Sequence, residues 1–189
     1  MWWHAATPAA QALVPDRLRP GPRVTVAALI RYLDSPVGAY SEVLACPHLL
    51  AGALRRGVLA RVHVPFIAVD SNASVHGGRA HWALPKALAA FADTEVNGDG
   101  WQVSATATPK GPWLPVRGRL GSAQVNGSGT TLSAVTTSKG KARLATVRVT
   151  VASRGELASW LLPGTHRGAV LKGRLLVGPS SPEQDQRVD

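Results

Sequence analysis

Hydrophobic and polar residues alternate along much of the chain, a period of two that is typical of β-strands with one buried face. The clearest example is residues 142–152, in which Val147, Val149 and Val151 alternate with polar side chains. Many such short segments, separated by turns, predict a mainly β fold, an antiparallel barrel or sheet. The other segments expected to be strands are 23–33, 39–45, 62–69, 94–96, 101–108, 116–125, 130–137 and 169–177.

Turn-forming residues separate these segments and leave room for one or two short helices, which makes the class α+β. Residues 97–100 and 138–141 are rich in glycine or small polar residues and predict hairpin turns. A helix is expected over 73–76, because the two glycines that follow it favour a helix end. A second helix is expected over 156–162, and residues 86–91 are expected to form a single helical turn after Pro85.

The length of 189 residues is that of one domain, so we expect a single domain over 1–189. Residues 1–22 contain four prolines and predict an irregular start, with 1–12 as the N-terminal lead-in. The polar residues 180–189 predict a flexible tail. No apolar run approaches the roughly 18 residues of a membrane helix, and the first residues lack the pattern of a signal peptide. We therefore expect a cytoplasmic protein without a membrane partner.

The net charge of +10 raises the question of nucleic-acid binding. Arginine accounts for most of the basic residues, in a chain also rich in alanine, glycine and proline, which is the bias of a GC-rich genome. The basic residues are also scattered along the sequence, and their one adjacent pair is Arg55-Arg56. We therefore expect no nucleic-acid partner, although the overall positive field would attract small anions.

Common catalytic and metal-binding motifs are missing from the sequence. The six histidines have no paired spacing of the kind that binds metals, and Cys46 with His48 is more typical of core packing. A phosphate-binding loop and a serine-nucleophile elbow are also absent. We therefore expect no metal site.

The segment around Lys86 offers the clearest candidate for chemistry. This lysine is one of five in the chain and follows Trp82, Ala83, Leu84 and Pro85. Apolar surroundings lower the pKa of an amine and favour its neutral, nucleophilic form. Such an amine can attack a ketone and form an imine, which withdraws electrons from the neighbouring carbon. The alternative is a lysine that reaches from an apolar strand end to water.

Three short motifs follow one another along the first half of the chain. They are Leu13-Val14-Pro15-Asp16, then Gly38-Ala39-Tyr40-Ser41-Glu42, then Gly78-Arg79 followed after six residues by Pro85-Lys86. In this order and spacing they resemble the acetoacetate decarboxylase family, with its Val-Pro-Glu turn, its Gly-x-Tyr-x-Glu and its Gly-Arg…Pro-Lys signature. The resemblance covers residues 13–91.

This resemblance implies a cone-shaped, mainly antiparallel barrel, a homo-oligomer, and a cavity that ends at the lysine. It implies Lys86 as the Schiff-base nucleophile and Glu42 as a catalytic residue in the cavity, where a carboxylate can pass a proton to the enamine or orient the substrate. The alternative for Glu42 is a surface ion pair at a strand end. No cofactor is implied, because the imine is itself the electron sink. The partner is then a small anionic keto acid.

Four further residues are assigned to substrate binding, each with a structural alternative. Arg79 either approaches the amine or ties its loop to a carbonyl or carboxylate. Tyr40 either hydrogen-bonds within the site or packs. Trp82 is expected to form a cavity wall, and Phe66 is expected in the core, where it would at most line the cavity.

Two departures from the family pattern bear on the reaction. Ala87 stands where the classical members carry a second lysine, and spacing back from Glu42 places Ala27 where a second cavity glutamate is expected. We therefore expect Schiff-base chemistry on a small keto or β-keto acid, either decarboxylation or an aldol or dehydration variant. The alternative is a non-catalytic protein that binds a small apolar ligand, because residues 84–91 also resemble the short motif of plant neoxanthin-deficiency proteins.

Overall fold

One large sheet contains the strands of this chain in a computed structural model that describes residues 1–51, 58 and 60–183. Three short helices accompany it within these described residues, one more than the two expected at most, and the predicted mainly β class is confirmed. The helices are α1 (Pro8–Ala12), α2 (Asn72–Trp82) and α3 (Leu157–Trp160). The strands are β1 (Trp2–Ala5), β2 (Val24–Tyr32), β3 (Tyr40–Cys46), β4 (Leu49–Leu50), β5 (Ala60–Val62), β6 (Phe66–Val69), β7 (Ala87–Leu88), β8 (Ala90–Ala92), β9 (Glu95–Gly98), β10 (Trp101–Val125), β11 (Thr131–Ser153), β12 (Gly164–Val177) and β13 (Ser181–Pro182).

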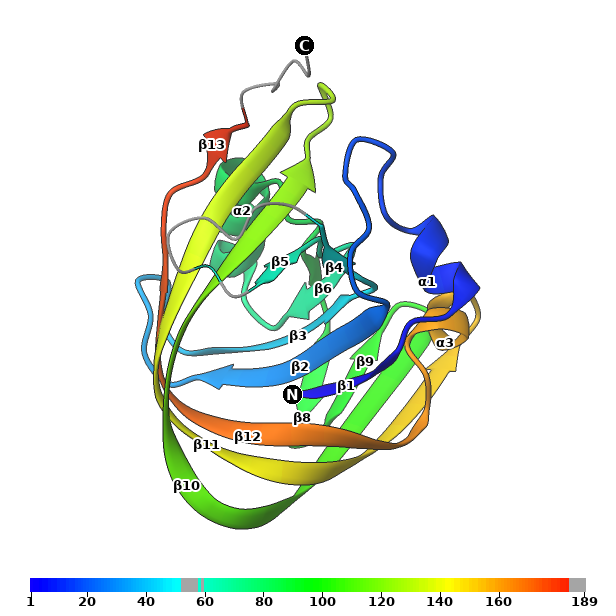
Figure 1. Cartoon of the computed structure of the whole chain (residues 1–189), viewed down its shortest axis with the longest axis vertical. Coiled ribbons are helices and arrows are strands. Elements are labelled where there is room, and N and C mark those ends of the chain that lie inside the picture. Colours follow the sequence, from blue (N-terminus) through cyan, green and yellow to red (C-terminus); the bar gives the residue numbers. More distant parts are fainter. Residues whose placement is uncertain (52–57, 59, 184–189) are drawn as a thin grey trace.

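The strand order is β4-β5-β10-β11-β12-β1-β2-β3-β6-β7, with β8, β9 and β13 paired beside this path. Most neighbours are antiparallel, and β5 with β10 and β6 with β7 are parallel. The two ends of the order, β4 and β7, do not pair with each other within the described residues, so the expected barrel is an open, strongly curved sheet. Figure 1 shows β10, β11 and β12 curving round the lower part of the molecule, with the β10–β11 hairpin passing in front of α2.

β10 and β11 are much longer than the sequence pattern indicated. The turn expected at residues 138–141 is wrong, because β11 continues through it and pairs with β10 on one side and β12 on the other. Gly140 allows β11 and β12 to approach each other closely and does not form a turn. A Cβ atom at this position would lie 2.1 Å from the carbonyl oxygen of Lys172.

The predicted irregular lead-in is also wrong. β1 pairs with both β2 and β12, and Trp2 is fully buried in the main core. The prolines misled the prediction, because Pro8 occupies the start of α1, where its missing N–H costs nothing. Thr7 caps this helix by accepting a hydrogen bond from the amide of Ala10. At the other end β13 pairs with β11, and residues 184–189 of the expected tail lie outside the described residues.

α2 is longer than expected because it runs through Gly77 and Gly78. Its N-cap is Ser71, whose side chain accepts a hydrogen bond from the amide of Ser74. It ends at Ala83, which adopts a left-handed conformation with φ of 52°. The single helical turn expected over 86–91 is replaced by β7 and β8.

The two faces of β2 and β3 look into different surroundings. Paired residues share a face, so Ala27 and Ala45 lie on one face, and Ile30 and Glu42 lie on the other. The first, which we call the core face, packs against the inward side of β10 and β11 around Trp2. The second, which we call the site face, carries Glu42.

His63 lies buried under the upper part of β10, where its Nδ1 is 3.2 Å from the carbonyl oxygen of Ala123. Burial lowers the pKa of His63 below 6.5, and hydrogen bonding to Ala123 and Gln124 opposes this in part. The unfolded chain therefore binds more protons than the folded chain below about pH 6.5, so this contribution to stability is complete above that pH and is lost as the pH falls.

We predict that the unfolding free energy falls less in His63→Gln than in the wild type when the pH is lowered from about 7.5 to about 5. Denaturant unfolding at a series of pH values measures this. His76→Gln, at an exposed position, is the control and is expected to keep the wild-type dependence. Parallel curves for the wild type and His63→Gln would contradict the assignment.

Within residues 1–51 and 60–183, no helix combines the length and the apolar composition that crossing a membrane requires.

Candidate active site

A buried ion pair between Lys86 and Glu42 forms the centre of the site. Lys86 Nζ donates hydrogen bonds to Glu42 Oε2 at 2.6 Å and to Ser74 Oγ at 2.9 Å. Only 6% of Lys86 and 4% of Glu42 is exposed. A lysine and a glutamate are rarely buried to this extent without a partner. The predicted nucleophile and acid therefore lie together inside the protein, and Lys86 does not reach out to water.

Three elements bring these side chains together. Glu42 lies on the site face of β3, opposite Ile30 on β2 and Val69 on β6. Lys86 immediately precedes β7, which pairs in parallel with β6. Ser74 comes from the first turn of α2, the helix that connects β6 to β7 along the chain.

The backbone around Lys86 is shaped to admit its side chain. Gly78 lies in α2 directly against it, because a Cβ atom on Gly78 would lie 2.6 Å from Lys86 Cδ and 2.8 Å from Cε. The left-handed Ala83 ends the helix and turns the chain back. Arg79 Nε then donates a hydrogen bond of 2.8 Å to the carbonyl oxygen of Lys86. A helix, a turn and a side chain thus hold the lysine in place.

Two tyrosines extend the site along the β2–β3 hairpin. Tyr32 donates a hydrogen bond of 3.3 Å to Glu42 Oε1. The rings of Tyr32 and Tyr40 stack with centroids 4.5 Å apart, and Lys86 Nζ lies 5.4 Å from the Tyr40 centroid. Burial, followed by the charge of Glu42, raises the pKa of both tyrosines. Both therefore remain neutral phenols that can donate hydrogen bonds at neutral pH.

The Lys86 amine and the Glu42 carboxylate are in direct contact inside the protein. At 2.6 Å the two groups are close enough for a proton to pass directly from nitrogen to oxygen. Glu42 can therefore accept the proton that the Lys86 ammonium has to lose before the amine can act as a nucleophile.

The residues assigned to substrate binding differ in where they lie and in what they contact. Tyr40 lies at the site, as described. Arg79 shows the structural alternative, because its contact is the Lys86 carbonyl oxygen. Trp82 is half-buried and donates a hydrogen bond of 2.9 Å from Nε1 to the carbonyl oxygen of Gly178, so it ties α2 to the end of β12. A role for Trp82 as a cavity wall stays a prediction.

Phe66 lies on the core face of the sheet and not at the site. Its ring packs edge-on against Trp101 and Trp160, with centroids 4.9 Å and 6.4 Å away. It lines a separate surface cavity of about 500 Å³ together with Trp101 and Leu157. Its residue number has the opposite parity from the positions of β6 that share the site face, such as Val69, which is why it points away from Lys86.

The expectation for Ala27 also needs correction. Ala27 pairs with Ala45 on the core face, next to Trp2, so a carboxylate there would not join Glu42. The position directly opposite Glu42 on β2 is Ile30. Ala87, the other departure, is exposed and pairs with Ala68 of β6.

The sequence did not reveal Tyr32 and Ser74. Tyr32 joins the site because the β2–β3 hairpin pairs it with Tyr40, and that register is not readable without the structure. Ser74 lies within the helix expected over 73–76, but the direction of its side chain depends on how α2 packs.

No group of three or more histidine, cysteine, aspartate or glutamate side chains that could hold a metal occurs in the described part of the chain. Cys46 is buried, and burial raises the pKa of its thiol to about 12. It packs with Val62 and Ile67 as a small apolar side chain.

Comparisons with known proteins agree with this architecture. The family model of acetoacetate decarboxylase (ADC) matches residues 3–159. No curated protein matches the chain. Among solved structures, one from structural studies of acetoacetate decarboxylase is 16% identical with a TM-score of 0.61, covering 95% of this chain and 85% of that chain. The acetoacetate decarboxylase of Legionella pneumophila subsp. pneumophila is 16% identical with a TM-score of 0.51, covering 94% and 83%.

A third solved structure is the enduracididine biosynthesis enzyme MppR complexed with pyruvate. It is 14% identical with a TM-score of 0.59, and the match covers 96% of this chain and 86% of that chain. At these identities the solved structures show a shared fold, and the match of the family model over most of the sequence shows the family. The chain belongs to the acetoacetate decarboxylase family.

Proposed function

We propose that this protein is an enzyme that forms a Schiff base between Lys86 and a small keto or β-keto acid. The observation that carries the proposal is the buried contact of 2.6 Å between Lys86 Nζ and Glu42 Oε2. A lysine with a purely structural role is more stable when its ammonium reaches water, because taking both charges of an ion pair out of water has a large desolvation cost. Two apolar side chains of the same size would fill the same space without that cost. A reactive amine, in contrast, needs both a dry site and a base beside it.

Imine formation starts with transfer of a proton from the Lys86 ammonium to Glu42. The free amine attacks the carbonyl carbon of the substrate and forms a C–N bond, and one proton of the attacking nitrogen passes to the carbonyl oxygen, which becomes a hydroxyl. Glu42, now a carboxylic acid, protonates this hydroxyl, which leaves as water and produces the iminium.

The iminium then accepts electrons from the substrate. In a β-keto acid the bond to the carboxylate breaks, carbon dioxide leaves, and the electron pair moves toward nitrogen to form an enamine. The enamine carbon takes a proton, and one water hydrolyses the resulting iminium and regenerates the Lys86 amine. In the proposed reaction Glu42 passes protons in these steps, supported by its contact with Lys86 Nζ and by the hydrogen bond that the Tyr32 hydroxyl donates to its second oxygen.

The enamine also permits the second class of reaction. An α-keto acid without a β-carboxylate cannot lose carbon dioxide in this way, but its enamine can attack an aldehyde, and the product can lose water. The related fold of MppR was solved with pyruvate, an α-keto acid. Decarboxylation and aldol or dehydration chemistry therefore both follow from the same imine, and the substrate decides between them.

Reductive trapping tests the proposal. The protein is incubated with acetoacetate or pyruvate and sodium borohydride, and peptide masses locate the adduct. We expect the added mass on the peptide that contains Lys86, and we expect none on that peptide in Lys86→Met. The other four lysines are exposed, so labelling of their peptides serves as the internal measure of non-specific reaction.

Absence of an adduct at Lys86 across a panel of α- and β-keto acids would overturn the proposal. A small apolar ligand that co-purifies with the protein, together with an unreactive Lys86, would instead favour the non-catalytic binding protein.

A further inference from the structure

The nitrogen of Lys86 has two hydrogen-bond acceptors within the described residues. Nζ donates to Glu42 Oε2 at 2.6 Å and to Ser74 Oγ at 2.9 Å. Tyr40 is a neighbour of another kind, because the amine lies over its ring, 5.4 Å from the centroid. A proton that leaves the nitrogen can therefore pass to a carboxylate or to a hydroxyl.

Imine formation removes two protons from this nitrogen. The ammonium carries three protons, and the iminium keeps one of them. The first proton goes to Glu42, which leaves the amine free to attack. The second has to reach the carbonyl oxygen after the C–N bond has formed, when Glu42 is already a carboxylic acid. The second transfer therefore needs a carrier of its own.

Neither Glu42 nor a direct transfer suits this second step. Glu42 Oε2 holds the first proton, and Oε1 accepts the hydrogen bond of Tyr32 at 3.3 Å. A transfer straight from nitrogen to oxygen would close a four-membered ring, whose N–H···O angle is far below the roughly 120° under which such contacts weaken steeply. A hydroxyl between the two atoms opens this ring to six members and allows straighter contacts.

Ser74 has the chemistry of such a carrier. A serine hydroxyl accepts one hydrogen bond while it donates another, so it can take up a proton and release its own in the same step. Only 5% of Ser74 is exposed. Burial and the charge of Glu42 raise the pKa of Tyr40, and a hydrogen bond with Ser74 opposes them. The hydroxyl of Ser74 therefore serves the site, between Lys86 and Tyr40.

Helix α2 fixes Ser74 against the lysine. Its amide donates a hydrogen bond of 3.2 Å to the side chain of Ser71, the N-cap. Gly78 follows four residues later on the same face of the helix, and it packs against the Lys86 side chain. One helix face thus provides both the room for the lysine and a hydroxyl at its nitrogen.

We propose that Ser74 is a catalytic residue that carries the second proton from the Lys86 nitrogen to the carbonyl oxygen of the substrate. Ser74 Oγ bonds to the proton of the nitrogen while its own O–H bond breaks, and the released proton bonds to the carbonyl oxygen. The serine is restored in the same step, so no co-reactant is needed. This proposal rests on the proposed Schiff-base function.

Two reactions of the same amine separate this role from mere support of the lysine. Reductive trapping with acetoacetate and sodium borohydride requires the transfer from nitrogen to oxygen. Acetylation by 4-nitrophenyl acetate requires a nucleophilic amine as well, but nitrophenolate leaves without a proton. The measured quantity is the ratio of the trapping rate to the acetylation rate at Lys86, from peptide masses.

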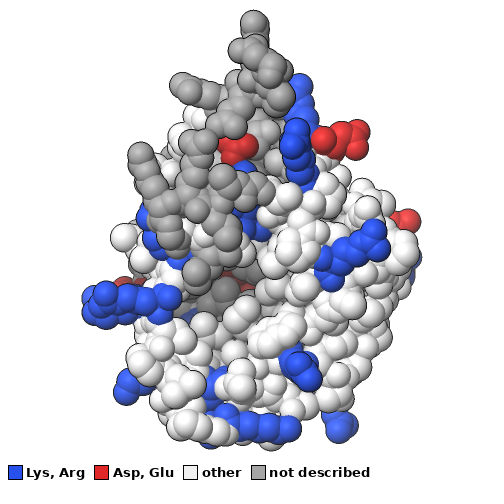
Figure 2. Space-filling view, viewed as in Figure 1, with Lys and Arg blue, Asp and Glu red and all other residues white. Residues whose placement is uncertain are grey.

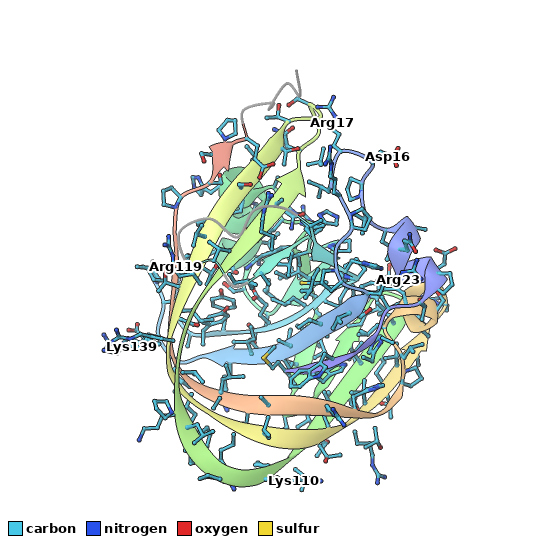
Figure 3. All side chains as sticks on the ribbon, in the orientation of Figure 1. Asp16, Arg17, Arg23, Lys110, Arg119 and Lys139 are labelled. Carbon is cyan, nitrogen blue, oxygen red and sulfur yellow. The ribbon has the colours of Figure 1, made fainter. Side chains whose placement is uncertain are left out.

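Lys139 provides the internal reference for both reagents, because it is exposed and Figure 3 shows it projecting away from the molecule. In Figure 2 the blue side chains of lysine and arginine likewise stand out from the surface. Reaction at Lys139 is expected to be the same in every variant.

Ser74→Ala is expected to lower the ratio at least about tenfold, because general acid–base transfer typically contributes a factor of 100 or more. Ser71→Ala is the matched control. It removes a hydroxyl from the start of the same helix and weakens the cap, but it leaves Ser74 in place, so the ratio is expected to stay at the wild-type value. Circular dichroism of each variant reports whether it folds.

A second pair of variants keeps the shape of the side chain constant. Ser74→Thr and Ser74→Val have the same branching, and only the first retains a hydroxyl. Ser74→Thr is expected to keep the larger part of the wild-type ratio, and Ser74→Val to fall as Ser74→Ala does. Equal ratios for these two variants, with an adduct in the wild type, would overturn the role of Ser74 and leave the Schiff-base function standing. Absence of any adduct in the wild type would overturn both.

Discussion

Replacing Gly78 with alanine is expected to slow imine formation at Lys86 at least tenfold while the protein stays folded. The new methyl group would lie 2.6 Å from Lys86 Cδ, so the side chain would have to move away from Glu42. A displacement of about 1 Å at a reacting atom can cost a factor of about 100 in rate. The rate of reductive trapping with a keto acid measures the effect.

Gly77 provides the matched control within the same helix. A Cβ atom on Gly77 has nothing within 4 Å, so Gly77→Ala meets no side chain. Alanine favours the helix over glycine by about 0.5–1 kcal/mol. We therefore expect Gly77→Ala to raise the thermal midpoint and to leave the trapping rate unchanged. Equal trapping rates for the two variants would show that Gly78 does not position the lysine.

Breaking the buried pair on one side is expected to be the largest loss of stability available to a single substitution at the site. Lys86→Met leaves the Glu42 carboxylate buried without its cation, and Glu42→Gln leaves the ammonium without its anion. Each is expected to lower the unfolding free energy by about 3–5 kcal/mol. The double variant removes both charges and is expected to recover about 2 kcal/mol or more of the summed loss.

Denaturant unfolding of the wild type, the two single variants and the double variant measures this coupling. A coupling near zero would mean that the two groups are solvated and not paired. Lys139→Met provides a comparison for loss of a lysine, because Lys139 is exposed and is expected to change stability by less than about 0.5 kcal/mol.

The alternation of side chains predicted the fold class, and the resemblance carried by the three motifs predicted Lys86 and Glu42 as the central residues of the site. Both the alternation and the motifs can be recognised from neighbouring residues in the sequence, because neither depends on contacts between distant parts of the chain. The glycines show where local signals mislead. Gly78 is in a helix because Lys86 needs the space, and Gly140 is in a strand because β12 approaches closely. Those reasons lie in other parts of the chain.

Register explains most of the remaining differences at the site. Tyr32 belongs to it because it pairs with Tyr40, and Ala27 does not because its position on β2 faces the core. A shift of a single residue in a strand reverses the face of a side chain, so spacing along the sequence does not decide which residues meet.

The basic residues illustrate the same limit on a larger scale. They are scattered along the sequence and form no continuous basic run. The strand pairing nevertheless brings Arg117, Lys139 and Arg174 into one row. Like charges directly opposite one another destabilise a sheet. The charge pattern of the surface is therefore a property of the topology.

The hydrogen bond from Arg79 to the carbonyl oxygen of Lys86 fixes the main chain of Lys86 but not its side chain. Its main chain is tethered to α2 by this hydrogen bond, and its side chain is packed against Gly78 and paired with Glu42. In the proposed reaction, any movement of Nζ toward a substrate would therefore come from the torsion angles of the side chain, with the loop left in place. Since an ordered segment does not have to be assembled anew for each molecule of substrate, its conformational entropy is lost once, on folding.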